Sequence, residues 1–304
     1  MDLPVTLQPT VCAICGSPDN CDEVYPANFS MEAFNPKIFS ARRLPDRIHY
    51  RLVRCRACGL LRSDPVADAE ALSRLYARSA QTYDRELDNL KHTYGRYLAW
   101  LERYGGRKGA LLEIGCGNGF VLEEALAQGY AEAWGVEPSA QAVEKAAPAL
   151  RGRIVCDVFR PGLFPAGRFD AIAFFQVFDH LPDPNAALAE AWRILKPGGL
   201  ALALNHNTAA FSARLLGERS PIVDIEHTYL YDPATMAKIF EKHGFQVAGR
   251  GAVFNDYSLQ YLFQLVPLPK GLKLGLLRLL KNSRLGRLRL QVPLGNQYLI
   301  ARKP

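Results

Sequence analysis

The sequence predicts an α/β protein in which a doubly wound, mostly parallel sheet follows a small N-terminal module. Three observations predict this fold. Strand and helix patterns alternate over most of the chain, a glycine-rich turn joins the first such strand to its helix, and two Cys-x-x-Cys pairs stand near the N-terminus. A chain of 304 residues can hold one α/β domain and a smaller module. Alternating strands and helices favour a sheet covered by helices on both faces.

Residues 1–65 are expected to form a zinc-binding module. Cys12 and Cys15 make one pair, Cys55 and Cys58 make the other, and a glycine follows each pair. Two thiolates on one tight turn, joined by a second such turn, complete a tetrahedral zinc site. Disulfides are unusual in cytoplasmic proteins. The sequence therefore predicts Zn²⁺ held by four thiolates, with buried metal-free thiols as the alternative.

Residues 66–106 are expected to form a helical lid or linker, with one short helix over 68–78 and a longer one over about 85–104. Residues 107–256 then carry most of the sheet. Strands are expected near 110–115, 132–136, 153–156, 169–175, 199–204, 245–254 and 297–303, the last lying in a final segment, 297–304. Helices are expected near 119–128, 139–148, 185–195 and 232–243. Ligands of such sheets bind at the carboxyl ends of the strands.

The turn after the first of these strands suggests the ligand. Glu113 precedes three glycines on alternate positions, Gly115, Gly117 and Gly119. Glycine permits a positive φ and lets a ligand approach the backbone closely. In a dinucleotide-binding loop the third glycine comes one residue later. The acid before the loop suits a cationic amino-acid moiety better than a diphosphate, and the pattern resembles the S-adenosylmethionine loop of class I methyltransferases.

Further cofactor contacts are expected at the ends of the next strands. Glu137 stands 22 residues beyond Gly115 and can accept hydrogen bonds from both hydroxyls of an adenosine ribose. The alternative is a carboxylate placed at a helix N-terminus by the helix dipole. Asp157, which closes the third strand, is expected at the adenine amino group. Gln176, which directly follows the fourth strand, completes the cofactor-binding set.

A second run of motifs extends the resemblance to class I methyltransferases over roughly residues 85–256. It comprises Phe169-Asp170 at the start of a strand, His180, Asp183-Pro184 and the sequence Leu-Lys-Pro-Gly-Gly at 195–199. The resemblance implies S-adenosylmethionine as the cofactor and a Rossmann-like seven-stranded sheet whose last strand is antiparallel. Residues 178–180 read Phe-Asp-His where many relatives have Leu-Glu-His.

Methyl transfer needs an aligned acceptor and, where the acceptor is not yet anionic, a group that removes its proton. His180 and His206 follow the fourth and fifth strands, and Glu226-His227 lies before the next helix. A carboxylate beside an imidazole can raise its basicity. Structural alternatives are a hydrogen bond from His180 to a loop carbonyl and a helix cap by His227. We favour the structural role for His180 and the catalytic role for Glu226 and His227.

The chain also resembles, in part, zinc-carrying sugar C-methyltransferases, which begin with two Cys-x-x-Cys knuckles and carry a Glu-His pair with a tyrosine three residues after the Glu. Glu226, His227 and Tyr229 match that pattern. The resemblance implies that His227 removes a proton next to a ketone, that Glu226 orients it or polarises the substrate, and that Tyr76 or Tyr83 closes over the acceptor. This chain lacks the additional C-terminal domain of those enzymes, so O-methylation of a saccharide or a lipid-linked intermediate stays open.

Residues 257–296 are expected to form a basic amphipathic insertion that emerges on the active-site side of the sheet. The segment from Tyr257 to the end has nine of the 37 basic residues and none of the 30 acidic ones. On a helical wheel over 270–284, lysines and an arginine share one side (Lys270, Lys273, Lys281 and Arg284) and leucines the other (Leu272, Leu276, Leu279 and Leu280). Such a helix can lie on an anionic bilayer. The alternatives are leucines packed on the sheet, or a dimer interface.

These features predict a methyltransferase that uses S-adenosylmethionine and acts on a saccharide, nucleotide-sugar or lipid-linked small molecule, which can be phosphorylated. The alternatives are an RNA base methyltransferase and a non-catalytic zinc-dependent binding protein. The first 256 residues carry no net positive charge, which argues against nucleic acid as a partner. No apolar run reaches the roughly 20 residues of a membrane span, and no signal-peptide pattern is present. We expect a cytoplasmic protein, with 270–290 as a peripheral contact to the inner membrane surface; the sequence indicates no oligomeric state.

Overall fold

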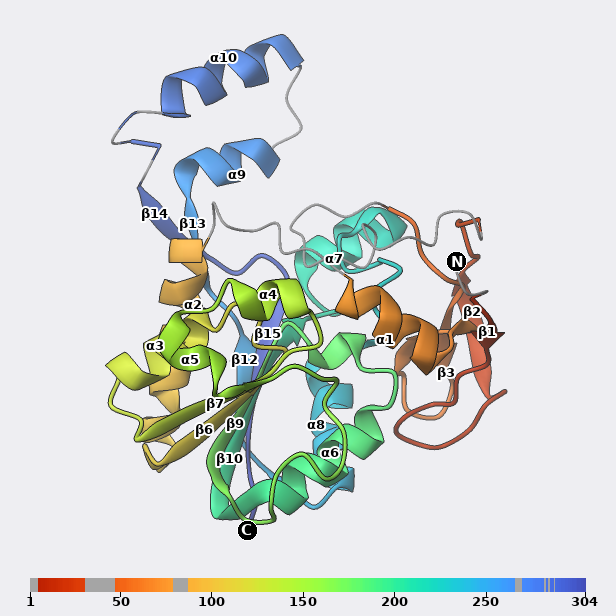
Figure 1. The fold of residues 1–304 in the computed structure, drawn as a ribbon. Coiled ribbons are helices and arrows are strands. Elements are labelled where there is room, and N and C mark those ends of the chain that lie inside the picture. Colours follow the sequence, from red (N-terminus) through yellow and green to blue (C-terminus); the bar gives the residue numbers. More distant parts are fainter. Residues whose placement is uncertain are drawn as a thin grey trace.

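The protein is built around one seven-stranded sheet (Figure 1). The computed structural model describes residues 5–30, 47–78, 87–265, 270–281, 283, 285–286 and 288–304. The strand order is β12-β15-β10-β9-β6-β7-β8. The strands are β6 (Ala110–Ile114), β7 (Glu132–Val136), β8 (Ile154–Val155), β9 (Phe169–Phe175), β10 (Leu195–His206), β12 (Gln246–Ala252) and β15 (Asn296–Arg302). β15 is antiparallel to both of its neighbours, β10 and β12. The strand pairs of this sheet that do not include β15 are parallel, which confirms the predicted fold.

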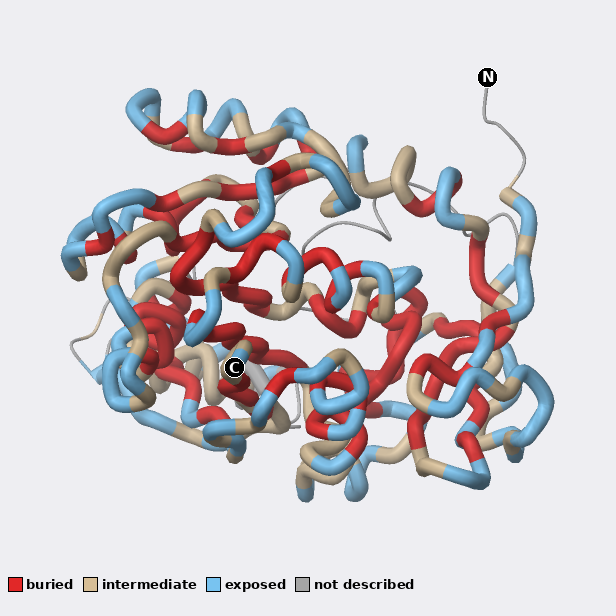
Figure 2. The backbone as a smooth tube through the Cα atoms, turned by 90° about the horizontal axis from the view of Figure 1, so that it is seen from below, coloured by how far each residue is buried: buried red, intermediate tan, exposed pale blue. Residues whose placement is uncertain are grey.

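Helices cover both faces of the sheet because its central strands are apolar on both sides. All seven residues of β9 are buried, with Phe169, Ile172 and Phe174 in one core and Ala171, Ala173 and Phe175 in the other. Strands buried on both faces are typical of parallel sheets. The first core includes side chains of α6 (Pro184–Ile194) and α8 (Pro233–Lys242), and the second includes those of α2 (Leu87–Arg103) and α3 (Phe120–Ala127). Figure 2 shows the buried backbone running through the middle of the molecule.

The helix expected over 139–148 is interrupted. Ser139 caps α4 (Ala140–Glu144), and a second helix, α5 (Pro148–Arg151), begins at a proline. Pro148 has no N–H to donate and its ring would clash with the carbonyl four residues earlier, so it begins a helix but does not continue one. The helices expected before the sheet are confirmed as α1 (Ala69–Ala77), capped by Asp68, and α2.

The N-terminal module contains short strands that were not among the predicted elements. β2 (Cys21–Tyr25), β3 (Leu52–Cys55) and β4 (Leu61–Ser63) form an antiparallel sheet, and β1 (Leu7–Gln8) pairs with β5 (Val66–Ala67). A fourth strand of the larger sheet, β11 (Tyr229–Leu230), comes from far along the chain and pairs with β4. The N-terminal module and the methyltransferase-like part of the chain therefore share a sheet.

The basic insertion leaves the carboxyl end of β12 and stands above the carboxyl edge of the main sheet (Figure 1). It contains β13 (Asn255–Ser258), α9 (Leu259–Leu265), α10 (Lys270–Lys281) and β14 (Arg289–Val292), with β13 and β14 paired. α10 packs against α9 instead of the sheet, so that Leu280 is buried while Leu279 is 74% exposed. The alternative in which the leucines of this helix pack on the sheet therefore does not hold for Leu279. Arg284, and the side chains of Lys270 and Leu272, lie outside the described part of the chain.

Three short elements complete the carboxyl edge: η3 (Phe178–His180), α7 (Phe211–Leu216) and η4 (Gly217–Arg219). Within the described ranges, no helix is both long enough and apolar enough to cross a membrane.

Candidate active site

The glycine-rich turn after β6 adopts a backbone that requires glycine. Gly115, Gly117 and Gly119 all have positive φ angles, of 71°, 54° and 75°, a region that side chains disfavour. A Cβ atom on Gly115 would also clash with the side chain of Val177, which follows β9. Gly119 is the N-cap residue of α3. The turn therefore lies tightly between the ends of two neighbouring strands, at the edge where ligands of such sheets bind.

Glu137 joins this turn to the end of β7. Its side chain is buried, and its two carboxylate oxygens accept hydrogen bonds from the backbone N–H groups of Gly117 (2.8 Å) and Ser139 (2.9 Å). Each oxygen retains a lone pair, so the carboxylate can still accept hydrogen bonds from a diol. The turn and the acid thus lie side by side, as the ribose assignment requires.

Buried acceptors without partners surround the same turn. Among the described residues, Glu113 Oε2, Asn118 Oδ1 and Gln176 Oε1 are buried and have no hydrogen-bond partner. Gln176 also has a positive φ of 55°, a strained conformation for a side-chain-bearing residue. Buried polar atoms are normally satisfied. Three unpaired acceptors fit a ligand that brings donors or positive charge, such as the ammonium and sulfonium groups of S-adenosylmethionine.

Asp157, the carboxylate expected at the adenine amino group, already has hydrogen-bond and ion-pair partners. It accepts a hydrogen bond from the N–H of Val158 (2.8 Å) and forms an ion pair with Arg160 (2.8 Å). Its side chain remains 32% exposed. The role of Asp157 at adenine stays a prediction. In that role its carboxylate would accept a hydrogen bond from the adenine amino group in addition to those from Val158 and Arg160.

Glu113 is expected to make folding pH-dependent. Burial, and then the neighbouring charge of Glu137, raise the pKa of Glu113 well above 4.5. A carboxyl group whose pKa is raised in the folded state contributes stability below its unfolded pKa, and that contribution is lost as the pH rises towards the folded pKa. Glu113→Gln should therefore stabilise the cofactor-free protein, with a gain that grows by up to about 1.4 kcal/mol per pH unit above about pH 4.5.

Denaturant unfolding of the wild type and of Glu113→Gln at about pH 6 and about pH 8 measures this gain. Glu144→Gln, on the exposed surface of α4, is the matched control. A stability difference that does not change with pH would show that Glu113 ionises normally.

Asp179, His180, His206 and His227 come together at the same edge, and we refer to these four residues as the histidine cluster. Asp179 Oδ2 lies 2.8 Å from His206 Nδ1 and 3.9 Å from His227 Nε2, and Asp179 Oδ1 lies 3.7 Å from His180 Nε2. The ring of His227 is 4.8 Å from that of His180 and 4.7 Å from that of His206. These residues come from η3, the end of β10 and the loop before β11.

The environment of the histidine cluster favours neutral imidazoles at His180 and His227 and an ionised carboxylate at Asp179. Burial acts to raise the pKa of Asp179, but the hydrogen bond from His206 and the nearby imidazoles outweigh it and lower the pKa. Burial lowers the pKa of His180 to about 4 and also lowers that of His227. Near pH 7 the imidazoles of His180 and His227 are therefore neutral and each has a ring nitrogen with a lone pair, and Asp179 would stabilise an imidazolium that forms.

The other expected catalytic residues lie beside the histidine cluster. The Tyr76 hydroxyl is 3.1 Å from His180 Nδ1, and burial followed by the charge of Glu226 raises the pKa of Tyr76. Glu226 itself is buried. Tyr229, by contrast, donates its hydroxyl to the carbonyl of Val11 in the N-terminal module (3.0 Å). Tyr83 lies outside the described residues.

Sequence reasoning gave no role to Asp179 and only a candidate position to His206. Both follow strands of the sheet, and Asp179 is the departure from the usual Leu-Glu-His sequence, which was the available signal. Their pairing is a tertiary contact across 27 residues of sequence.

The four cysteines of the N-terminal module form one cluster. Cys12 Sγ lies 3.4 Å from the sulfur atoms of Cys15 and Cys58, Cys15 Sγ lies 3.4 Å from that of Cys55, and all four sulfur atoms are within 4.8 Å of one another. Tetrahedral zinc ligands lie roughly 3.7 Å apart. The geometry and the four sulfur donors fit Zn²⁺. Cys21, which also lies in this module, is outside the cluster.

The cysteine cluster also has unequal thiol acidities. Burial acts to raise the pKa of Cys55, but hydrogen bonds from backbone N–H groups and neighbouring thiols outweigh it and lower the pKa to about 6. Burial, and then the hydrogen bond with Cys55, raises the pKa of Cys15 to about 11. The thiols therefore do not ionise together unless a cation compensates their charge.

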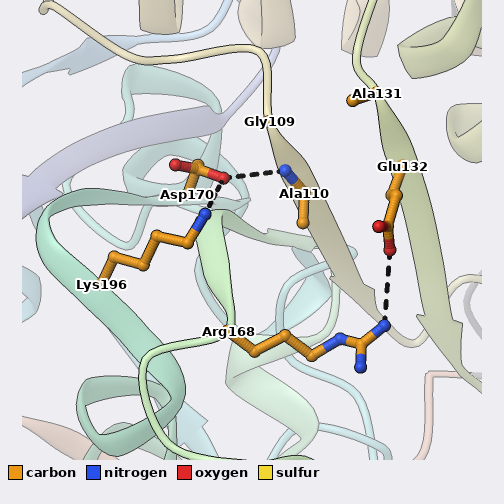
Figure 3. A pocket seen from close by; sticks show the side chains of 7 residues that line it. All are labelled: Gly109, Ala110, Ala131, Glu132, Arg168, Asp170 and Lys196. Atoms are coloured by element: carbon orange, nitrogen blue, oxygen red, sulfur yellow. Dashed lines mark hydrogen bonds and ion pairs between the residues drawn. The ribbon is translucent and has the colours of Figure 1, made fainter.

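A pocket of about 380 Å³ lies at the opposite, amino-terminal edge of the sheet (Figure 3). Its charged side chains pair with each other: Lys196 with Asp170 (2.6 Å) and Arg168 with Glu132 (3.4 Å). Asp170 also accepts the N–H of Ala110 (2.8 Å). Because its charged groups are paired with each other and it lies far from the strand carboxyl ends, this pocket is not the candidate active site.

Comparison with known proteins agrees with this geometry. The family described as "Methyltransferase domain" matches residues 83–248. An uncharacterized methyltransferase of Geobacillus kaustophilus is 31% identical over 185 residues, covering 57% of this chain and 85% of that protein. A ubiquinone biosynthesis O-methyltransferase of Bordetella avium is 24% identical over 180 residues, covering 54% and 74%. A solved SAM-dependent methyltransferase from Archaeoglobus fulgidus is 19% identical with a TM-score of 0.49, covering 78% of this chain and all of that one.

The family match spans more than half of the chain and includes the glycine turn, Glu137 and Asp179. The chain belongs to the methyltransferase-domain family and is an S-adenosylmethionine-dependent methyltransferase.

Proposed function

We propose that this methyltransferase acts on a saccharide, nucleotide-sugar or lipid-linked small molecule whose reacting hydroxyl or carbon must first lose a proton. The histidine cluster is the observation that supports this proposal. Two of its members, Asp179 and His180, come shortly after Gln176 and Val177 in sequence, and Val177 packs on Gly115 of the glycine turn. A proton-accepting group therefore lies next to the expected cofactor crevice. One relative is named an O-methyltransferase, which is compatible with a hydroxyl acceptor.

The chain's own residues would bind, orient and deprotonate the acceptor. When bound, S-adenosylmethionine supplies an electrophilic methyl group. Glu113, Asn118 and Gln176 would face its cationic groups, and Glu137 its ribose. We assign proton removal to His227, whose Nδ1 bonds to the carbonyl of Ile222 (2.7 Å), so that Nε2 carries the lone pair. Tyr76 and Glu226 would position the acceptor, and His180 would hold Tyr76.

The cofactor assignment predicts that Glu137→Ala weakens S-adenosylmethionine binding by about 10- to 100-fold. A hydrogen bond to a charged group contributes roughly 1.5–3 kcal/mol, and about 1.4 kcal/mol corresponds to a tenfold change in affinity. The same substitution leaves the N–H groups of Gly117 and Ser139 without their acceptor, so some loss of stability should accompany it. Isothermal titration with S-adenosylmethionine, below the melting temperature of the variant, measures the affinity.

Glu144→Ala, which removes an exposed carboxylate on α4, serves as the control and should bind normally. Unchanged affinity in folded Glu137→Ala would show that the ribose is held elsewhere.

We also propose that the carboxyl edge contacts an anionic membrane, from which a lipid-linked acceptor would be drawn. Of the eleven exposed large apolar side chains in the described residues, eight lie in α7 or the insertion and a ninth, Phe254, directly precedes β13: Phe211, Leu215, Leu216, Leu274, Leu279, Leu285, Leu288 and Leu290 make up the eight. Arg278 and Lys281 are exposed beside Leu274 and Leu279 on α10. Exposed apolar residues interspersed with basic ones suit a bilayer interface.

This contact predicts that the double variant Arg278→Gln, Lys281→Gln binds anionic vesicles about 30-fold more weakly, since each basic residue near such a surface contributes about 1 kcal/mol. Co-sedimentation with phosphatidylglycerol-containing vesicles measures the partitioning. A double variant of basic residues on α8, Lys238→Gln with Lys242→Gln, is the control for net charge. Equal partitioning of the wild type and the α10 variant would mean that these residues are only solvated.

A further inference from the structure

Three members of the histidine cluster are arranged like ligands of a metal ion. Asp179, His206 and His227 each offer one ligand atom, and these atoms all lie within 4.8 Å of one another. The residues come from three separate segments, each of which begins or ends at the carboxyl edge of the sheet. Two imidazoles and one carboxylate on one side of a site, with the remaining positions open, are a recurrent ligand set for first-row transition metals.

Hydrogen bonding fixes which atom of His227 faces the carboxylate. A carbonyl oxygen can only accept, so His227 Nδ1 must donate its proton to Ile222 at 2.7 Å. In the neutral ring, Nε2 then carries a lone pair, and this lone pair faces Asp179 Oδ2 at 3.9 Å. A proton or a metal ion between these two electron-rich atoms would satisfy both of them.

The surroundings of Asp179 also favour a bound cation. The side chain is 1% exposed, and Oδ1 has no hydrogen-bond partner among the described residues. Its other oxygen is 2.8 Å from His206 Nδ1. An ion bound at about 2.1 Å from each ligand allows separations of up to about 4.2 Å between them, and both contacts of Asp179 Oδ2 lie within that limit.

The second contacts of His227 and Asp179 are also those of metal ligands. Metal-binding histidines usually donate their other ring N–H to a carbonyl or carboxylate, which fixes the ring. His227 does so through Ile222. The backbone carbonyl of Asp179 in turn accepts the N–H of Thr228 at 2.9 Å, which ties the two loops together. His206 has a side chain that is 28% exposed, and this leaves a path for an ion to enter.

We propose that Asp179, His206 and His227 bind a first-row divalent transition ion, distinct from the zinc expected at the cysteines. The two imidazoles suit Zn²⁺ or Fe²⁺, and the carboxylate also admits Mn²⁺, whereas Ca²⁺ prefers a site made of oxygen ligands. Its role rests on the proposed function: the open coordination positions would hold the acceptor oxygen and lower its pKa. In the loaded site His227 Nε2 binds the ion, and the proton that the acceptor loses would pass to solvent on the exposed side of His206.

Zinc content tests the site without any acceptor. Full-length protein is equilibrated with Zn²⁺, passed through a desalting column and measured by elemental analysis. We expect about two ions per chain in the wild type and in His92→Asn, whose histidine is exposed on α2, and about one in His206→Asn. S-adenosylmethionine binding shows that each variant is folded. After mild chelation to one zinc per chain, Mn²⁺ should bind the wild type but not His206→Asn, as detected by electron paramagnetic resonance.

The site is rejected if the wild type holds a single zinc that Cys55→Ser removes, or if His206→Asn keeps the second ion. Activity separates the two proposals. Turnover that persists in chelated protein and depends on His227 would overturn the metal role and leave the proposed function standing. If the protein binds a second ion but methylates no saccharide, nucleotide-sugar or lipid-linked acceptor, the metal site would stand and the proposed function would be overturned.

Discussion

Replacing His227 with asparagine is expected to slow methyl transfer by about 100- to 10,000-fold, the range that proton transfer by a positioned side chain contributes. The asparagine amide can take the place of Nδ1 and keep the bond to the Ile222 carbonyl, so the loop should stay in place. It offers no basic atom in the position of Nε2. Single-turnover kinetics with the purified acceptor, together with calorimetric S-adenosylmethionine binding, measure the chemical step and the affinity separately.

The affinity for S-adenosylmethionine should be unchanged in His227→Asn, because the glycine turn and Glu137 do not contact that side chain in the hydrogen bonds described above. His92→Asn, on the exposed side of α2, should retain full activity. If His227→Asn turns over at the wild-type rate, another group of the histidine cluster must accept the proton, and His206→Asn becomes the informative variant.

Replacing Cys55 with serine is expected to release the Zn²⁺ that we propose for the four cysteines of the N-terminal module, and to abolish turnover as well. Structural zinc contributes on the order of 10 kcal/mol to small zinc-dependent folds, so this module should lose its ordered form. The loss should reach the active site, because Ser63 in β4 donates its hydroxyl to the carbonyl of His227 (2.7 Å) and its N–H to that of Thr228 (2.9 Å). Elemental analysis, thermal unfolding and turnover measure the three effects.

Cys21→Ser is the matched control, since Cys21 lies in the same module but outside the cysteine cluster. It should retain zinc and activity. Cys55→Ser protein with an unaltered zinc content would exclude the four-thiolate site, and Cys55→Ser protein that loses zinc but keeps full turnover would show that the module and the active site are uncoupled.

The main sheet could be predicted because its signals are local. An apolar run such as 169–175 predicts a strand that is buried on both faces of a parallel sheet. Glycine and proline residues mark the turns and helix ends between such runs. The cysteine knuckles are equally local, since Cys12 with Cys15 and Cys55 with Cys58 each occupy one turn. Pro148 also indicated the end of the helix expected over 139–148. The helical periodicity on both sides of Pro148 nevertheless favoured one continuous helix.

The strands of the N-terminal module and the pairing in the histidine cluster could not be predicted in the same way. β4 and β11 are three and two residues long, too short for an alternation pattern to be recognised. Their partners are chosen by tertiary packing. The contact between Asp179 and His206 likewise depends on two strand ends meeting in space, and no spacing in the sequence encodes it.

The strand pairing of Tyr229–Leu230 with the N-terminal sheet has a consequence for protein engineering. A chimaera that exchanges residues 1–65 for the knuckle region of another enzyme would leave these two residues with unpaired amide and carbonyl groups, unless the graft presents a compatible edge. In engineered chimaeras, the N-terminal module and the methyltransferase domain of this enzyme should therefore be exchanged together, as one unit.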